Sequence, residues 1–214
     1  PAAFVESTLL GRSFRRLCFD DRLEMRPAFN NRDGLAAVYN RQICEENREK
    51  ILLFVHDDVW LEDFFICERL EEALKEFDVV GVAGNTRRVS RQPSWSHVSE
   101  SPFVADSPLN LSGVVAHGSQ PGAALNHYGI SGRACMLLDG LFLAARCGSL
   151  LDAEVKFDER FDFHFYDMDF CRGAEKAGLR IGTWPIAVTH ASGALFGTPA
   201  WRGALQVYLD KWGE

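Results

Sequence analysis

An uninterrupted apolar run, Ile-Leu-Leu-Phe-Val at residues 51–55, is followed at once by His56, Asp57 and Asp58. Apolar side chains at every position, rather than at every second one, indicate a strand that is covered on both faces. Such strands are typical of α/β proteins, in which helices pack on the two sides of a sheet. The abrupt change to acidic side chains predicts that the strand ends there. In α/β sheets, this carboxyl end is the edge at which ligands bind.

The segments around this run predict alternating helices and strands. Residues 35–46 and 61–77 carry apolar side chains at the spacing of amphipathic helices, and residues 79–83 form the next short apolar run. Helix, strand, helix and strand over residues 30–84 predict a doubly wound, mostly parallel sheet. In this scheme, residues 2–6 would supply the first strand.

The rest of the chain divides into an irregular segment and a second regular one. Residues 86–132 are rich in Ser, Pro, Gly, His and Asn and show little periodicity. We therefore expect a long irregular segment there, of the kind that forms lids or substrate walls. Regular structure resumes after it, with strands expected at 134–138, 141–145, 180–184 and 186–189 and helices at 166–177 and 199–212.

The charge of the chain argues against a nucleic-acid groove. Its formal net charge is −7, whereas such a groove needs a basic stripe along one face. A short basic cluster is formed by Arg87, Arg88 and Arg91. It is either a solvated loop or a clamp on phosphates or on an anionic acceptor. No apolar stretch approaches the about 20 residues of a transmembrane helix, and the first residues lack the pattern of a signal peptide.

The cysteines carry no recognisable motif. The six cysteines contain no Cys-x-x-Cys pair, so no zinc knuckle or redox motif is expected. Cys44, Cys67 and Cys171 follow apolar residues, where a free thiol behaves as a small hydrophobe. We therefore expect buried, reduced thiols in a cytoplasmic protein. Because the chain begins at Pro1 rather than at Met, further residues could precede it.

The acidic residues that follow the apolar run are the first candidates for chemistry. The adjacent carboxylates of Asp57 and Asp58 would repel each other unless they share a cation or a proton. Hard oxygen ligands suit Mg²⁺ or Mn²⁺, and these ions in turn suit a diphosphate. The alternative is structural, because an aspartate here can cap the helix expected from residue 61.

A second group of polar residues lies in the aromatic-rich stretch 161–171. Here His164, Tyr166, Asp167 and Asp169 stand among four phenylalanines. Negative charge at the start of a helix stabilises the helix by itself. A carboxylate beside so much apolar surface can also have a raised pKa, which suits a general base.

His190 ends the last strand-like run before the terminal helix. A lone histidine is more often structural than a metal ligand. However, parallel strands of one sheet bring their carboxyl ends to the same edge, and Asp58 also lies just beyond an apolar run. We therefore expect His190 and Asp58 to share one metal site.

The order and spacing of these motifs resemble those of GT-A glycosyltransferases of the family 2 type. In that family, a Gly-x-Ala-x-x-x-Asn segment precedes the acidic strand, and it is matched here from Gly34 to Asn40. The family's Asp-x-Asp is matched by residues 56–58, with His56 in place of the first Asp. This His-x-Asp form resembles that of a bacterial glycosyltransferase-like branch. The resemblance extends over roughly residues 30–192.

The second half of the chain carries the remaining matches. The family's Glu-Asp-x-Asp corresponds to residues 166–169, in which Tyr166 replaces Glu. Its histidine after the last core strand corresponds to His190. The segment that contains Asp139 and Gly140 is similar to the strand that lines the sugar pocket in that family.

The resemblance implies a single GT-A domain over residues 1–214, with a Rossmann-like, mostly parallel central sheet flanked by helices. Residues 1–84 would form the nucleotide and metal half, and residues 85–214 the sugar and acceptor half. The implied reaction moves a sugar from a nucleotide-diphosphate sugar, most often UDP-linked, to a hydroxyl of a saccharide, lipid or protein acceptor. It would depend on Mn²⁺ or Mg²⁺.

The resemblance also implies a role for each candidate residue. Asp167 would be the general base that removes the proton of the acceptor hydroxyl. Asp58 and His190 would hold the cation. Other candidates would bind the nucleotide or the sugar of the donor, or position a metal-bound water: Gly34, Asn40, His56, Asp57, Asp139, Gly140 and Asp169. In the irregular segment, Trp95 and Tyr128 would either stack on sugars or anchor the loop on the core.

Two other classes of protein remain open at this stage. One is a non-catalytic module that binds a nucleotide sugar without transferring it. The other is a metal-dependent phosphohydrolase, suggested by the His-Asp-Asp sequence at residues 56–58. In the HD-type hydrolases such a pair lies on helices of an all-α fold, so the strand content separates that class from an α/β transferase.

Overall fold

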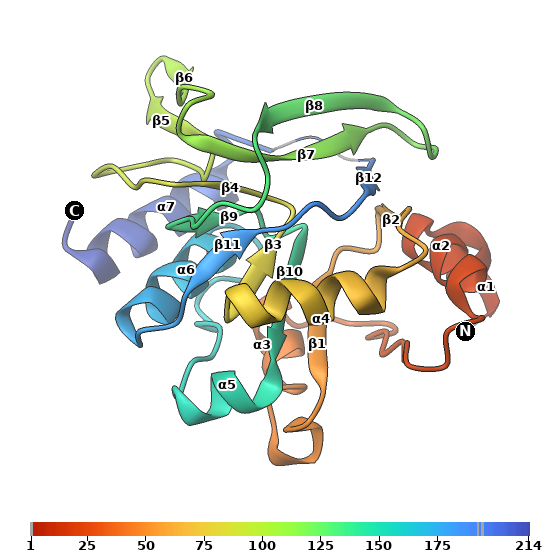
Figure 1. The fold of residues 1–214 in the computed structure, drawn as a ribbon. Helices are drawn as coiled ribbons and strands as arrows, with labels where there is room; N and C mark the ends of the chain where they lie inside the picture. The colour runs from red at the N-terminus through yellow and green to blue at the C-terminus, as the bar shows by residue number, and fades with distance from the viewer. Residues whose placement is uncertain (1, 192, 194) are drawn as a thin grey trace.

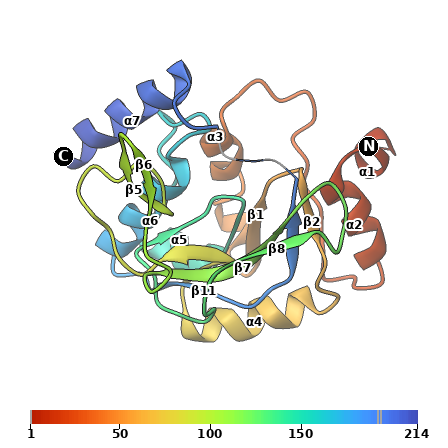
Figure 2. The same cartoon turned by 90° about the horizontal axis from the view of Figure 1, so that it is seen from above.

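The computed structural model describes residues 2–191, 193 and 195–214. In this part of the chain the strands belong to a central sheet, a second sheet and a small hairpin (Figure 1). The order in the central sheet is β1 (Ile51–Val55), β10 (Phe142–Arg146), β3 (Val79–Gly81) and β11 (Ile181–Thr183). Figure 2 shows α4 (Ile66–Glu76) on one side of these strands and α3 (Leu35–Asn40) on the other.

The central sheet is mixed, so the prediction of a mostly parallel sheet is wrong. β1 and β3 run in the same direction, as the helix between them predicts. However, β10 lies between them and is antiparallel to both, and only β3 and β11 pair in parallel within this sheet as described. The sequence does not indicate the antiparallel direction of β10, because β10 is as deeply buried as a parallel strand would be. Burial on both faces indicates flanking helices but does not set the direction of a neighbour.

The second sheet contains shorter strands. Their order is β2 (Val59–Leu61), β12 (Val188–His190), β7 (Leu111–His117), β4 (Ala83–Asn85) and β9 (Leu137–Leu138), with β8 (Ala124–Gly129) paired to β7. The strand expected at residues 79–83 is therefore two strands. The chain passes from the central sheet to the second sheet at Val82, between β3 and β4.

The segment 86–132 is not irregular, which corrects the second expectation. It contains β7, β8 and the hairpin of β5 (His97–Glu100) and β6 (Phe103–Ala105). All side chains of β6 and most of those of β8 are exposed. Because these strands bury few side chains, they lack the alternation of apolar and polar residues by which a half-buried strand is recognised.

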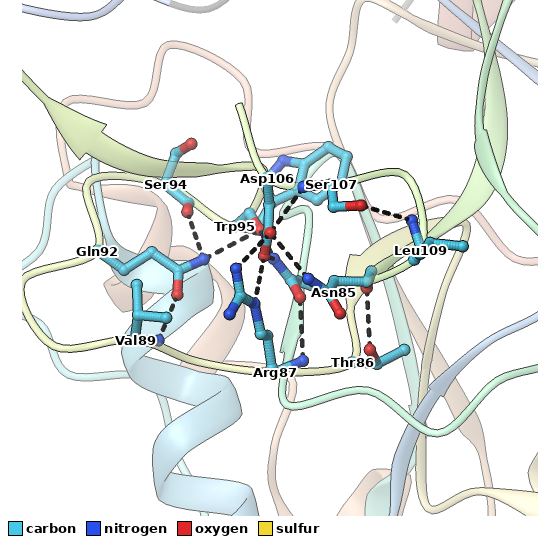
Figure 3. A network of polar contacts seen from close by, with 11 residues as sticks. Asn85, Thr86, Arg87, Val89, Gln92, Ser94, Trp95, Asp106, Ser107 and Leu109 are labelled. Atoms are coloured by element: carbon cyan, nitrogen blue, oxygen red, sulfur yellow. Dashed lines mark hydrogen bonds and ion pairs between the residues drawn. The ribbon is translucent and has the colours of Figure 1, made fainter. Parts of the chain in front are cut away.

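A polar network ties the start of this segment to the core (Figure 3). The carboxylate of Asp106 is buried, and it accepts hydrogen bonds from Arg87 at 2.6 Å, Asn85 at 2.9 Å and Asn110 at 2.9 Å. The pairing with Arg87 holds the pKa of Asp106 well below its usual value. Arg88 pairs with Glu175 at 2.7 Å. Arg87 and Arg88 therefore fasten the segment to the rest of the fold, and a role of the basic cluster in binding phosphates or an anionic acceptor stays a prediction.

The helices follow the sequence closely near the carboxyl end and less closely elsewhere. α6 (Tyr166–Lys176) and α7 (Pro199–Trp212) lie where they are expected, and the Thr198 hydroxyl caps α7 by accepting from the Trp201 amide at 3.2 Å. The helix expected from residue 61 begins later because β2 precedes it, and the helix expected at 35–46 ends with α3 and is followed by a 3₁₀ turn at Glu45–Asn47.

The expected strand at residues 2–6 is wrong, because these residues form α1 (Ala2–Ser7). A short apolar run does not distinguish a helix from a strand by its periodicity. α1 is followed by α2 (Leu9–Leu17), and α2 lies beside β2 (Figure 1). The guanidinium of Arg16 on α2 lies over the rings of Trp60, at 5.5 Å, and Phe64, at 5.1 Å. A further short helix, α5 (Cys147–Asp152), follows β10.

The cysteines are less uniformly buried than expected. Cys135, Cys147 and Cys171 are buried, but Cys44 and Cys67 are partly exposed and Cys18 is exposed. Among the helices in the described part of the chain, none combines the length and the apolar character needed to cross a membrane.

Candidate functional site

Three side chains with metal-binding atoms converge where β1, β2 and β12 end or begin. His56 follows β1, Asp58 precedes β2, and His190 is the last residue of β12. The Nε2 atom of His190 lies 3.4 Å from Oδ1 of Asp58. One candidate ligand atom from each of the three residues lies within 4.8 Å of the other two. We call this group the His-Asp-His cluster.

Strand pairing explains how the cluster forms. β12 is antiparallel to β2, with His190 opposite Val59, and the Ala191 amide donates to the Asp58 carbonyl at 3.1 Å. His56 is held at the end of β1, where its amide donates to the Leu141 carbonyl at 3.2 Å. Backbone hydrogen bonds therefore position the segments that carry these side chains.

The two histidines of the cluster have different electrostatic environments. Burial lowers the pKa of His56 and outweighs the opposing effect of the Asp139 and Asp58 charges. Burial also acts to lower the pKa of His190, but the hydrogen bond and the charge of Asp58 outweigh it, so that pKa is raised. A neutral imidazole offers a lone pair to a cation, whereas a histidine that shares a proton with a carboxylate exchanges that proton for the cation.

The chemistry of these side chains fits a divalent transition ion. Two imidazoles and one carboxylate combine nitrogen and oxygen donors. Mg²⁺ strongly prefers oxygen ligands and is usually held by carboxylates and phosphates, whereas Mn²⁺ and Zn²⁺ also accept imidazole. Of the two expected ions, the cluster therefore suits Mn²⁺ better than Mg²⁺.

The turn before β10 joins this cluster to Asp167. The Gly140 amide donates to Oδ2 of Asp167 at 2.9 Å, and the Met168 amide donates to Oδ1 at 2.8 Å. Burial, and then the charge of Asp139, raise the pKa of Asp167 to about 7. The Asp139 charge also acts to raise the pKa of His190. A carboxylate with such a pKa exchanges a proton readily near neutral pH, as a general base requires.

The helix that carries Asp167 begins from a strained residue. Phe165 precedes the first turn of α6 and has φ of 66°. A bulky residue adopts this left-handed conformation at a cost of about 1–3 kcal/mol. Its ring is buried against Trp201 and Tyr208 of α7, with centroids 5.6 and 5.3 Å apart. The packing of α7 therefore holds the backbone from which Tyr166 and Asp167 project.

Tyr166 lies in the site and is missed by the sequence analysis as a functional residue. Its hydroxyl donates to the Gly140 carbonyl at 2.8 Å and lies 2.7 Å from Nε2 of His56. The sequence feature that could have indicated its role is that Tyr166 precedes Asp167 at the position where GT-A glycosyltransferases of the family 2 type have Glu.

His117 is a second residue of the site with no individual role predicted from the sequence. Its ring centroid lies 5.8 Å from that of His190, because β7 and β12 pair in parallel with these two residues opposite each other. The hydroxyl of Tyr128 lies 3.2 Å from Nε2 of His117. Trp95 is buried and its ring packs edge-on against Tyr128 at 4.9 Å. Trp95 therefore anchors the loop, while Tyr128 extends the polar side of the site.

Other predicted residues are engaged elsewhere. The Asn40 side chain donates to the Phe157 carbonyl and accepts from the Phe157 amide, both at 2.9 Å. The Asp169 carboxylate binds Lys211 at 2.7 Å and the Trp212 indole at 2.9 Å. These contacts join distant segments of the fold. The expected contacts of Asn40 and Asp169 with a donor stay predictions.

Gly34 and Asp57 form no hydrogen bond with the cluster among those of the described residues, although the charge of Asp57 acts to raise the pKa of His56. A Cβ atom on Gly34 would lie 2.6 Å from the Cα of Asp162, so this glycine permits close packing of two backbones. Asp57 is exposed in the turn between β1 and β2, next to Asp58. A role of either residue in nucleotide binding stays a prediction.

Comparison with known proteins gives the family. The model of a family described as a glycosyltransferase-like family matches residues 24–192. The chain belongs to this family. No curated protein matches the chain. The matched range contains the His-Asp-His cluster, Tyr166 and Asp167. The strands around the cluster also contradict the all-α fold of an HD-type phosphohydrolase.

Proposed function

We propose that this chain is a Mn²⁺-dependent glycosyltransferase that moves a sugar from a UDP-linked donor to a hydroxyl group of an acceptor. The observation that carries the proposal is the convergence of His56, Asp58 and His190 into one group of candidate metal ligands. It is joined to Asp167 through Gly140 and Tyr166. Within a glycosyltransferase-like family, such a group fits the diphosphate of a nucleotide sugar.

The charges of the site support the need for a cation. Asp58, Asp139 and Asp167 would all repel a diphosphate, since like charges a few ångströms apart oppose each other strongly in a partly buried site. His56, Asp58 and His190 would hold the cation. When bound, the cation would neutralise the charge that develops on the leaving diphosphate.

The remaining steps belong to side chains of the chain itself. Asp167 would accept the proton of the acceptor hydroxyl, and its pKa of about 7 suits this exchange. The amides of Gly140 and Met168 fix its carboxylate. Asp139 accepts a hydrogen bond from the Leu141 amide at 3.1 Å, which orients it at the turn before β10. There it would bind hydroxyl groups of the donor sugar.

A donor screen tests the proposal. The protein is incubated with Mn²⁺ and with UDP-, GDP-, CDP- or dTDP-linked sugars, and release of the nucleoside diphosphate is followed with and without candidate acceptors. We expect release from a UDP-linked sugar, and no release by the Asp167→Asn protein. Binding of a UDP-sugar without release in the presence of any acceptor would indicate the non-catalytic module instead.

A further inference from the structure

A chain of hydrogen bonds runs from the backbone at Gly140 through Tyr166 to His56. The Tyr166 hydroxyl lies 2.8 Å from the Gly140 carbonyl oxygen and 2.7 Å from Nε2 of His56. Tyr166 is fully buried in the aromatic core, with its ring 6.0 Å from those of Tyr39 and Phe157. The hydroxyl is therefore held at these two partners by packing as well as by hydrogen bonding.

The chemistry of the three groups fixes the direction of both bonds. A carbonyl oxygen only accepts, so the single proton of the Tyr166 hydroxyl is donated to Gly140. The Tyr166 oxygen can then only accept from His56. Nε2 of His56 must carry a hydrogen, and in a neutral imidazole this leaves the lone pair on Nδ1.

We propose that Tyr166 is a positioning residue that fixes His56 in the Nε2–H tautomer, so that Nδ1 is the atom of His56 that binds the cation. Metal-binding histidines generally donate their other ring hydrogen to an oxygen, which sets the tautomer and the ring orientation. Here the oxygen belongs to a buried tyrosine rather than to a carboxylate. The assignment of Nδ1 as a metal-binding atom rests on the proposed function, whereas the Nε2–H tautomer of His56 does not.

Gly140 is also needed for this arrangement, because it leaves space for the Tyr166 hydroxyl. A Cβ atom on Gly140 would lie 2.3 Å from the Tyr166 hydroxyl oxygen and 2.8 Å from Cβ of Asp167. Only a glycine allows the tyrosine to reach the carbonyl of this turn. The absence of a side chain at residue 140 is therefore required for the position of Tyr166, independently of any contact with a sugar.

Nitrogen NMR of the metal-free full chain tests the tautomer directly. The protein is labelled with ¹⁵N-histidine and kept with EDTA at about pH 8, where an imidazole of ordinary pKa is neutral. His56 is assigned from the signals that the His56→Gln protein lacks. We expect a protonated Nε2 and an unprotonated Nδ1 in the wild type, and a shift toward the Nδ1–H form or a mixture in Tyr166→Phe. Tyr208→Phe removes a buried hydroxyl that contacts Arg172 at 3.2 Å, and it should leave the His56 signals unchanged.

Gly140→Ala should act like Tyr166→Phe, although it leaves the tyrosine in place. A wild-type His56 in the Nδ1–H form would overturn the proposal, as would identical His56 signals in the wild type and Tyr166→Phe. Calorimetry with Mn²⁺ supplies the second readout, for which we expect affinity in Tyr166→Phe to be lower by about 10–100-fold. Absence of Mn²⁺ binding to the wild type would contradict the metal site of the proposed function, and the NMR result would then decide the tautomer by itself.

Discussion

The Nε2 atom of His190 lies 3.4 Å from Oδ1 of Asp58. The two residues come from segments that are far apart in the sequence, and the pairing of β12 with β2 brings them together. Loss of a residue that only hydrogen-bonds to a metal ligand typically weakens metal binding by about 10–100-fold. Because His190 is proposed as a ligand itself, His190→Ala should weaken Mn²⁺ binding by more than this. Isothermal titration with Mn²⁺ measures this. His127→Ala, in the exposed part of β8, is the matched control and should bind Mn²⁺ like the wild type. Equal affinity in the two variants would exclude His190 from the site.

Asp167→Asn should abolish transfer and spare binding. Asparagine keeps the shape of aspartate, but its single carbonyl oxygen can accept from only one of the Gly140 and Met168 amides, and it cannot take up a proton. We expect kcat to fall by about 10²–10⁴-fold with the affinity for UDP nearly unchanged. If Asp167 served only to stabilise the start of α6, the variant would keep its transfer activity. Initial rates with an identified acceptor, together with UDP calorimetry, separate the two roles.

The raised pKa of Asp167 also predicts a pH dependence of stability. Its pKa is about 7 in the folded protein, against 3.8 for an unperturbed aspartate, so between these values the folded state holds the proton more tightly than the unfolded state. The contribution of Asp167 to stability is therefore lost as pH rises from about 4 to about 7. Asp167→Asn cannot titrate at this position, so its stability does not include this decrease with rising pH. Urea unfolding should find that the stability of the variant relative to the wild type increases as pH rises from about 4 to about 8. A difference independent of pH would contradict the assigned pKa.

Asn40 is predicted to act in folding. Its side chain satisfies both the amide and the carbonyl of Phe157, and Asn40→Ala would leave these partly buried groups without their partner. We expect the free energy of unfolding to fall by about 1–3 kcal/mol, with Mn²⁺ affinity unchanged. Asn31→Ala, at an exposed position, provides the comparison in urea unfolding. Unchanged stability together with weakened UDP binding would instead return Asn40 to the nucleotide site.

The sequence predicted that His190 and Asp58 lie close together, but it did not predict the sheets that bring them together. The proximity of His190 and Asp58 was expected from two parallel strands that end at one edge. The structure brings the residues together by another route, because β12 lies in the second sheet and is antiparallel to β2. The expectation held because both residues stand at strand ends, a local feature that the sequence contains. The partner of each strand depends on contacts between distant segments, which periodicity does not encode.

Tyr166 shows the same limit at the level of single side chains. Its position at the start of α6 could be predicted from the aromatic stretch and the helix that follows. Its bonds to Gly140 and His56 could not, since they join three segments whose relative placement is set by the whole core. The strands of residues 86–132 were missed for a different reason: their exposed side chains leave no hydrophobic pattern.

The central claim is that a cation held by the His-Asp-His cluster recruits the nucleotide. The most direct test is calorimetric titration of the protein with UDP, in the presence of Mn²⁺ or of excess EDTA. We predict that UDP binds in the presence of Mn²⁺ and does not bind in the presence of excess EDTA. In Asp58→Asn, UDP binding should be lost even when Mn²⁺ is present. Asp57→Asn should still bind Mn²⁺, because the Asp57 carboxylate is exposed. Equal UDP affinity with Mn²⁺ and with excess EDTA would contradict the account.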